Sequence, residues 1–176
     1  MTDSLEFSRP IDLDEIEKNG LQREIIAEAQ ECAALAQRFD ILGLEDLRAT
    51  LDIRKLDDGE TVTVTGHMTA KVTQKCTVSL DPFEADMSVE LGQVFVRAGA
   101  PVTEADEDLD GEDSYDDEIE GNAIDLGEMV AQCLALELDP YPRKPGIEYV
   151  PEAEKLQDSG AESPFAALAQ LKRDDC

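Results

Sequence analysis

In the segment TVTVTGHMTAKVT, residues 61–73, apolar and polar side chains alternate at every position. A period of two residues is the spacing of a strand with one buried face, because successive side chains of a strand point to opposite sides. The expected core face consists of Val62, Val64, Gly66, Met68, Ala70 and Val72, and the expected solvent face of Thr61, Thr63, Thr65, His67, Thr69, Lys71 and Thr73. This segment therefore predicts one long strand of a sheet that is covered on one side.

The same period continues on both sides of this strand, from residue 48 to residue 97. Before it, Ala49, Leu51 and Ile53 alternate with polar residues, and Asp57-Asp58-Gly59 predicts a hairpin turn. After Asp81-Pro82, the apolar positions are Phe83, Ala85, Met87, Val89 and Leu91. Because the links between these strands are short, the segment predicts an antiparallel meander.

The residues before the meander predict a strand followed by a helix. Residues 11–16 are compatible with one helical turn, and Asn19-Gly20 with a turn that needs a positive φ. Residues 21–29 fit either a strand or the start of one long helix, and we favour the strand. The helix is then expected over residues 30–39, with Cys32, Leu35, Ala36 and Phe39 on its buried face.

A second helix is expected within NAIDLGEMVAQCLALELDPYP, residues 122–142. Asn122 is expected to cap it, with Asp125 close to its positive end, and Asp139-Pro140 to end it. Its apolar stripe consists of Leu126, Met129, Val130, Cys133 and Leu134. Prolines at positions 140, 142, 145 and 151 predict an irregular exit from this helix.

Between the meander and the second helix the chain is strongly acidic. No Lys or Arg occurs from residue 98 to residue 142, and residues 104–120 hold eleven acids in seventeen positions. Like-charge repulsion and scarce apolar surface predict a disordered insertion, which we place at residues 102–121.

The end of the sequence, SPFAALAQLK at residues 163–172, predicts a short helix. Ser163 and Pro164 are typical of a helix start, and the helical spacing brings Phe165, Leu168 and Leu171 to one face. A helix of this length is unstable alone, so it must dock on its own sheet or, as a partner-binding helix, on another molecule.

Together these segments predict an α+β fold. It consists of an antiparallel meander of about five strands packed with two helices, an acidic disordered insertion and a short C-terminal helix. We expect a single domain over residues 1–150, followed by a linker and the terminal helix over residues 151–176.

Composition narrows the function further. Forty-two Asp and Glu against fifteen Lys and Arg give a formal charge of −27, which repels nucleic acid phosphates and attracts basic proteins. No apolar signal segment follows Met1, no run is long enough to span a membrane, and the four cysteines are widely spaced, so we expect a cytoplasmic protein with reduced thiols.

Catalytic, cofactor and metal sites are not predicted. Asp106, Asp108, Asp110 and Gly111 match the first half of a calcium loop, but Asp117 stands where a bidentate Glu belongs. The cysteines form no zinc knuckle, and no glycine-rich phosphate loop is present. His67 lies on the threonine face without a nucleophile, so we expect an exposed, hydrogen-bonded strand residue and not an enzyme.

The order of several short motifs resembles the YceD-type family, the large ribosomal RNA subunit accumulation proteins. The motifs are the "IDL" start and "LAL" end of the helix in residues 122–142, its proline-rich exit, and SPFAALAQLK. Further likeness lies in Ala33-Ala34-Leu35-Ala36, in residues 72–76 and in Pro82-Phe83. The resemblance implies a role in the accumulation of large-subunit (23S) ribosomal RNA, and hence in large-subunit assembly, without catalytic chemistry.

One departure from the family concerns a metal site. Many members carry a Cys-x-x-Cys pair in the sheet segment and another after the "LAL" helix, which resembles a zinc site. Here Cys76 matches the first cysteine, Ser79 replaces the second, and residues 139–144 offer none. The resemblance therefore implies that packing and proline-stiffened turns hold the same corner in this chain.

The resulting hypothesis is a non-enzymatic factor of ribosome biogenesis that binds a basic ribosomal protein or assembly factor, with at most indirect contact to ribosomal RNA and no membrane. The rival hypothesis is direct RNA binding through Arg143-Lys144 and Lys172-Arg173, the acidic segment then acting as an autoinhibitory lid. The candidate partner-binding residues are Phe165, Leu168, Leu171, Arg143 and Lys144.

Overall fold

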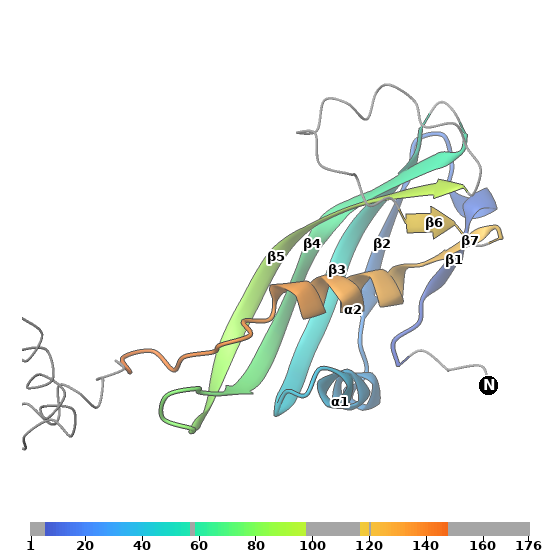
Figure 1. Ribbon diagram of the computed structural model, residues 1–176. Coiled ribbons are helices and arrows are strands. Elements are labelled where there is room, and N and C mark those ends of the chain that lie inside the picture. Colours follow the sequence, from blue (N-terminus) through green and yellow to red (C-terminus); the bar gives the residue numbers. More distant parts are fainter. Residues whose placement is uncertain (1–5, 57–58, 98–116, 120, 148–176) are drawn as a thin grey trace, which may run out of the picture.

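The longest alternating segment of the sequence forms the central strand of the observed sheet. The computed structural model describes residues 6–56, 59–97, 117–119 and 121–147. Its main sheet contains β2 (Leu21–Ile26), β3 (Gly43–Lys55), β4 (Thr61–Lys75), β5 (Pro82–Arg97) and β6 (Asp117–Ile119), in that spatial order (Figure 1). Neighbouring strands from β2 to β5 are antiparallel, whereas β6 runs parallel to β5. The predicted α+β meander is confirmed, with a parallel fifth strand added.

The alternating pattern predicts the buried face of this sheet correctly. Leu51 and Ile53 in β3 and Val64 and Met68 in β4 are fully buried, while the threonines of β4 lie on the opposite face. Gly66 lies opposite Leu51 in the register of β3 and β4. The strands twist together, as β-sheets do, and both helices lie on the buried face (Figure 1).

Helix α1 (Ala29–Arg38) begins one residue before its predicted start. Glu28 and Glu31 form a reciprocal capping box at its N-terminus, which explains why the strand period of β2 gives way to a helix there. Cys32, Leu35 and Ala36 are buried against the sheet, and Phe39 is partly buried beside them. The prediction of a strand followed by a helix is confirmed.

Helix α2 (Leu126–Glu137) begins three residues later than the sequence indicates. The predicted cap at Asn122 is wrong, because the backbone of β7 (Ala123–Asp125) pairs with β1 (Pro10–Asp12) before the helix starts. Asp125 is the cap, and its Oδ1 accepts from the amides of Gly127 and Glu128 at 3.0 and 3.1 Å. A carboxylate at this end also complements the helix dipole.

The pairing of β1 with β7 also corrects the start of the chain. Residues 11–16 do not form a single helical turn, since Pro10–Asp12 is a strand and only Leu13–Glu15, labelled η1, is a 3-10 turn. The backbone amide of Leu126, the first residue of α2, donates to the carbonyl of Arg9 at 3.1 Å. The N-terminal segment therefore completes the start of α2.

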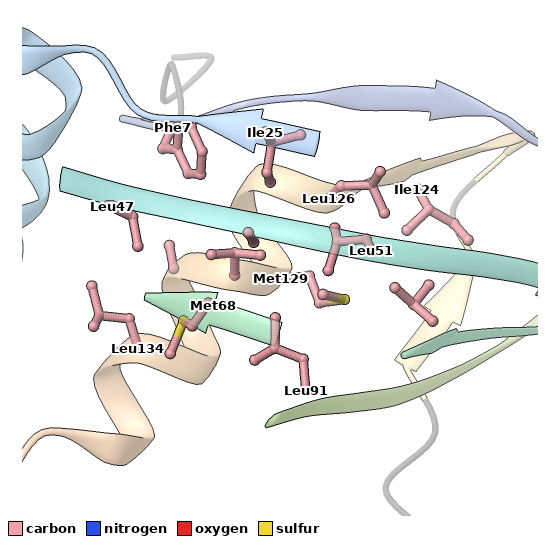
Figure 2. Packing of buried hydrophobic residues seen from close by; sticks show 14 of the residues in the cluster. Phe7, Ile25, Leu47, Leu51, Met68, Leu91, Ile124, Leu126, Met129 and Leu134 are labelled. Carbon is pink, nitrogen blue, oxygen red and sulfur yellow. The ribbon is translucent and has the colours of Figure 1, made fainter. Parts of the chain in front are cut away.

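One hydrophobic core joins these elements. Leu126, Met129 and Leu134 on α2 face Leu51, Met68 and Leu91 on the sheet (Figure 2). Cys133, the remaining member of the predicted stripe, is partly buried at the margin of this core. The apolar stripe thus predicts which face of α2 docks on the sheet.

Parts of the predicted architecture lie outside the described residues. The hairpin residues Asp57-Asp58, most of the acidic insertion at 102–121 and the terminal helix at 163–172 belong to this group. Within the expected insertion, Asp117–Ile119 forms β6, with Ile119 buried, which the sequence does not indicate. The domain boundary near residue 150 stays a prediction. In the described part of the chain, no helix is long and apolar enough to cross a membrane.

Candidate functional site

The predicted basic spot lies on the irregular segment that follows α2. Arg143 is exposed and Lys144 is half-buried, and neither forms an ion pair within the described residues. The other candidates, Phe165, Leu168, Leu171, Lys172 and Arg173, lie outside the described residues. The described structure therefore gives the position of Arg143-Lys144 alone, and the candidate set as a binding site stays a prediction.

This segment is fastened to the turn that follows β4. The backbone amide and the hydroxyl of Thr77 both donate to the carbonyl of Pro142, at 2.9 and 3.2 Å. The Gln74 side chain donates to the carbonyl of Asp139 at 3.2 Å. Arg143-Lys144 consequently has a defined place beside the β4–β5 turn, at the far end of the sheet from β6 (Figure 1).

Cys76 occupies the centre of this corner. It is fully buried, and the Ser79 amide donates to its sulfur at 3.4 Å. Hydrogen bonds from the Ser79 side chain, and then from the backbone amides of Ser79, Lys144 and Val78, lower the pKa of the Cys76 thiol to about 6. The sulfur is therefore held as an acceptor by protein donors.

The donor set at this corner does not fit a structural zinc ion, which requires four ligands. Cys76 supplies one thiol, whereas Ser79 and Pro142 offer a hydroxyl and a carbonyl that are already hydrogen-bonded. No group of three or more His, Cys, Asp or Glu side chains within the described ranges could hold a metal. The corner is connected by hydrogen bonds instead.

We expect the Cys76 thiol to titrate near pH 6, well below the usual value of about 8.5. The measurement is the ultraviolet absorbance of the thiolate as a function of pH, taken as the difference between the native protein and its Cys76→Ala variant. Ser79→Ala removes the hydroxyl and should move the midpoint upward. An unchanged midpoint in Ser79→Ala, or a native midpoint near 8.5, would contradict this geometry.

Most arginines of the described surface are neutralised by carboxylates of the same chain. Arg38 donates to both Glu128 oxygens, at 2.7 and 2.9 Å, and these hydrogen bonds hold the pKa of Glu128 below its usual value. Arg9 also forms a bidentate pair, in which its two terminal nitrogens donate to the two Glu31 oxygens at 2.7 and 2.8 Å. These pairs fasten α1 to α2 and to the N-terminal segment, so their positive charge is not available to a phosphate backbone.

The acidic surplus also reaches the sheet. Along β5, the side chains of Glu84, Asp86 and Glu90 are exposed on the threonine face, and that of Glu90 is 88% exposed. Half-buried apolar residues alternate with them on the core face. Strand β5 thus combines an acidic row, an apolar row and, before Phe95, a position at the border of the described sheet.

His67 has the surroundings expected from its place on the threonine face. Its Nε2 lies 3.2 Å from the Ser88 hydroxyl, and its Nδ1 lies 3.3 Å from a Glu90 oxygen. The side chain is 42% exposed on an open sheet surface. Residues 106–111, which match the first half of a calcium loop, lie outside the described residues. Asp117, which stands where the bidentate Glu of such a loop belongs, begins β6.

The fold and these side chains define a small α+β protein with an acidic row along one strand of its sheet. Residues 64–172 match the family described as large ribosomal RNA subunit accumulation protein YceD. The chain belongs to this family, which confirms the resemblance. No curated protein and no solved structure matches it significantly.

Sequence reasoning missed that most of β5 has a neighbouring strand on one side only within the described residues. A signal for it was present, because the last strand of a meander has a neighbour on one side unless another segment returns to it. The short parallel strand β6 returns, but it pairs only with Phe95–Arg97.

Proposed function

We propose that this protein supports large-subunit ribosomal RNA accumulation by binding a basic ribosomal protein or assembly factor, and that it acts by binding and not by catalysis. Membership of the family supports the role in ribosome biogenesis. The observation that carries the choice of partner is the charge of −27, combined with arginines that are paired within the chain. Such a surface attracts cationic polypeptides and repels RNA.

In this proposal the acidic surface substitutes for RNA. Basic ribosomal proteins carry segments that neutralise phosphates, and an anionic protein can cover those segments until the RNA displaces it. The exchange is favoured by the density of charge on RNA, which exceeds that of dispersed carboxylates. A released partner would then be available for assembly of the large subunit.

The experiment is retention of purified large-subunit ribosomal proteins on the immobilised protein at increasing salt. We expect the basic proteins to be retained at low salt and released steeply as salt rises, because counterions screen attraction between exposed charges over about 10 Å at 0.1 M. An acidic ribosomal protein serves as the control and should not be retained. Retention that is independent of salt, or none, would refute the proposal.

The rival, direct RNA binding, relies on Arg143 and Lys144 together with Lys172-Arg173. The exposed position of Arg143 beside the β4–β5 turn is compatible with a phosphate contact. Two basic dipeptides would have to overcome the surrounding negative field, which is why we give preference to a protein partner.

A further inference from the structure

Strand β5 has an open edge over much of its length. It pairs with β4 from Pro82 to Val96, whereas on its other side β6 pairs only with Phe95–Arg97. Within the described residues, the segment 83–91 therefore has a strand on one side only. The opposite border of the sheet is β2, which is much shorter, at six residues. An open edge is a row of unpaired backbone donors and acceptors that can accept another strand.

Two backbone hydrogen bonds show which groups of β5 face outward. The Arg97 amide donates to the Glu60 carbonyl at 3.0 Å, and the Cys76 amide donates to the Asp81 carbonyl at 2.9 Å. These residue pairs continue the register of β4 and β5 by one position at either end, and hydrogen-bonded pairs occur at every second position of an antiparallel ladder. The odd-numbered residues of β5 therefore bond to β4. The backbone groups of Glu84, Asp86, Ser88 and Glu90 point away from it.

The parallel strand β6 agrees with this assignment. β6 lies on the side of β5 away from β4 and pairs with Phe95–Arg97, of which Val96 is the even-numbered residue. Where β6 is present, the outward-facing backbone groups of β5 are thus on the side that pairs with another strand. The same ladder can be extended toward residue 84 without any change in the pairing of β4.

The side chains along this edge specify what kind of strand would fit. On the threonine face, Glu84, Asp86 and Glu90 are exposed and form an acidic row. On the core face, the half-buried residues Phe83, Ala85, Met87 and Val89 form an apolar row. An added strand would lie beside both rows, since successive side chains of a strand alternate between the two faces.

We propose that the 83–91 edge of β5 binds an extended, basic segment of the partner protein as an additional strand, with Lys or Arg facing the acidic row and apolar residues extending the core face. This inference rests on the proposed function and deepens it by naming the surface and the form of the partner. Backbone hydrogen bonds would supply affinity, and the two side-chain rows would supply specificity.

Charge disfavours a second copy of the chain and a nucleic acid as occupants of this edge. A second copy of the chain would place one acidic row beside another, and like charges facing each other across strands are destabilising. At a charge of −27 per chain, the approach of two copies is also opposed at long range. A nucleic acid offers neither backbone amides nor cationic groups to these carboxylates.

The test uses Ser88→Pro, with Ser88→Ala as its matched control. Proline removes one outward amide and places its ring on the open edge, and prolines are tolerated at strand positions whose amide faces solvent. Both variants lose the hydroxyl that lies 3.2 Å from His67 Nε2, and neither changes the acidic row. Thermal unfolding of both variants verifies that the sheet is intact.

The probes are a synthetic peptide of alternating Lys and Val, and the basic large-subunit proteins that the native protein retains. We expect Ser88→Pro to weaken both affinities about tenfold or more, which corresponds to about 1.4 kcal/mol, and Ser88→Ala to leave them within about twofold. Equal affinities for the two variants would overturn the edge as the site. If the basic ribosomal proteins are not retained by the native protein at all, the proposed function fails instead.

Amide hydrogen exchange gives a second readout that does not depend on any variant. In the free protein, the amides of Glu84, Asp86, Ser88 and Glu90 should exchange quickly and those of their odd-numbered neighbours slowly. Addition of the Lys-Val peptide should protect the even-numbered amides. Even-numbered amides that stay unprotected with bound peptide, or that are protected in the free protein by a second copy, would overturn the proposal.

Discussion

Gly66→Ala is expected to lower the free energy of unfolding by about 3 kcal/mol or more, the upper end of the range for overpacking a core. A Cβ at this position would lie 2.2 Å from the Thr50 carbonyl oxygen and 3.0 Å from the Leu51 Cα. Both are backbone atoms of β3, so the clash can be relieved only by separating the two central strands. The expected readout is the midpoint of urea unfolding.

Gly92→Ala is the matched control for this prediction. Gly92 lies in the neighbouring strand opposite Thr65, and a Cβ there would meet no heavy atom of the described chain within 4 Å. We expect its free energy of unfolding to change by less than about 0.5 kcal/mol, as is usual for open surface positions. Similar losses in both variants would show that the close approach of β3 and β4 is not the cause.

Neutralising the acidic segment is expected to lower the affinity for a basic ribosomal protein about tenfold or more, because each removed carboxylate weakens the attractive field. The variant replaces the eight acids from Glu104 to Asp116 with Asn or Gln. It leaves β6 intact, whereas removal of residues 104–120 would delete the buried Ile119 as well. The measurement is calorimetric titration at low salt.

The same variant separates the proposed function from the lid hypothesis. If the acidic segment covers an RNA-binding surface, its neutralisation should raise the affinity for ribosomal RNA sharply. The control is a variant in which residues 104–116 are shuffled, since this keeps the charge and changes the order. We expect the shuffled variant to bind as the native protein does, and unequal affinities would indicate a specific motif.

The meander could be predicted from the sequence because its information is local. Each of β3, β4 and β5 carries its own alternation, and a turn signal separates each from the next. The stripe on α2 likewise identifies its buried face, with Leu126, Met129 and Leu134 all directed to the sheet. Where one face of an element is buried, period and burial agree.

The elements that could not be predicted depend on contacts between distant residues. Strand β6 has three residues within an acidic segment, and its position is determined by Phe95–Arg97 of β5. The start of α2 depends on β1, more than one hundred residues earlier, because Pro10 pairs with Asp125. Neither pairing produces a local sequence pattern, so the sequence alone predicts the helix cap at Asn122.

The candidate site was predictable only in its charge. Composition predicts an acidic surface. It does not predict that Arg9 and Arg38 form ion pairs with Glu31 and Glu128. Nor does it show which strand lies at the border of the sheet. The predicted roles of Phe165, Leu168 and Leu171 stay predictions, since they lie outside the described residues.

The central claim is that the acidic surface binds a basic ribosomal protein in place of RNA. Its most direct test is a pair of affinities measured in the same buffers. One is for a purified basic large-subunit ribosomal protein, and the other for a fragment of large-subunit ribosomal RNA, each at low and at high salt. We predict tight binding of the ribosomal protein that is lost at high salt, and negligible binding of the RNA. Tighter binding of the RNA than of any basic ribosomal protein would contradict the account.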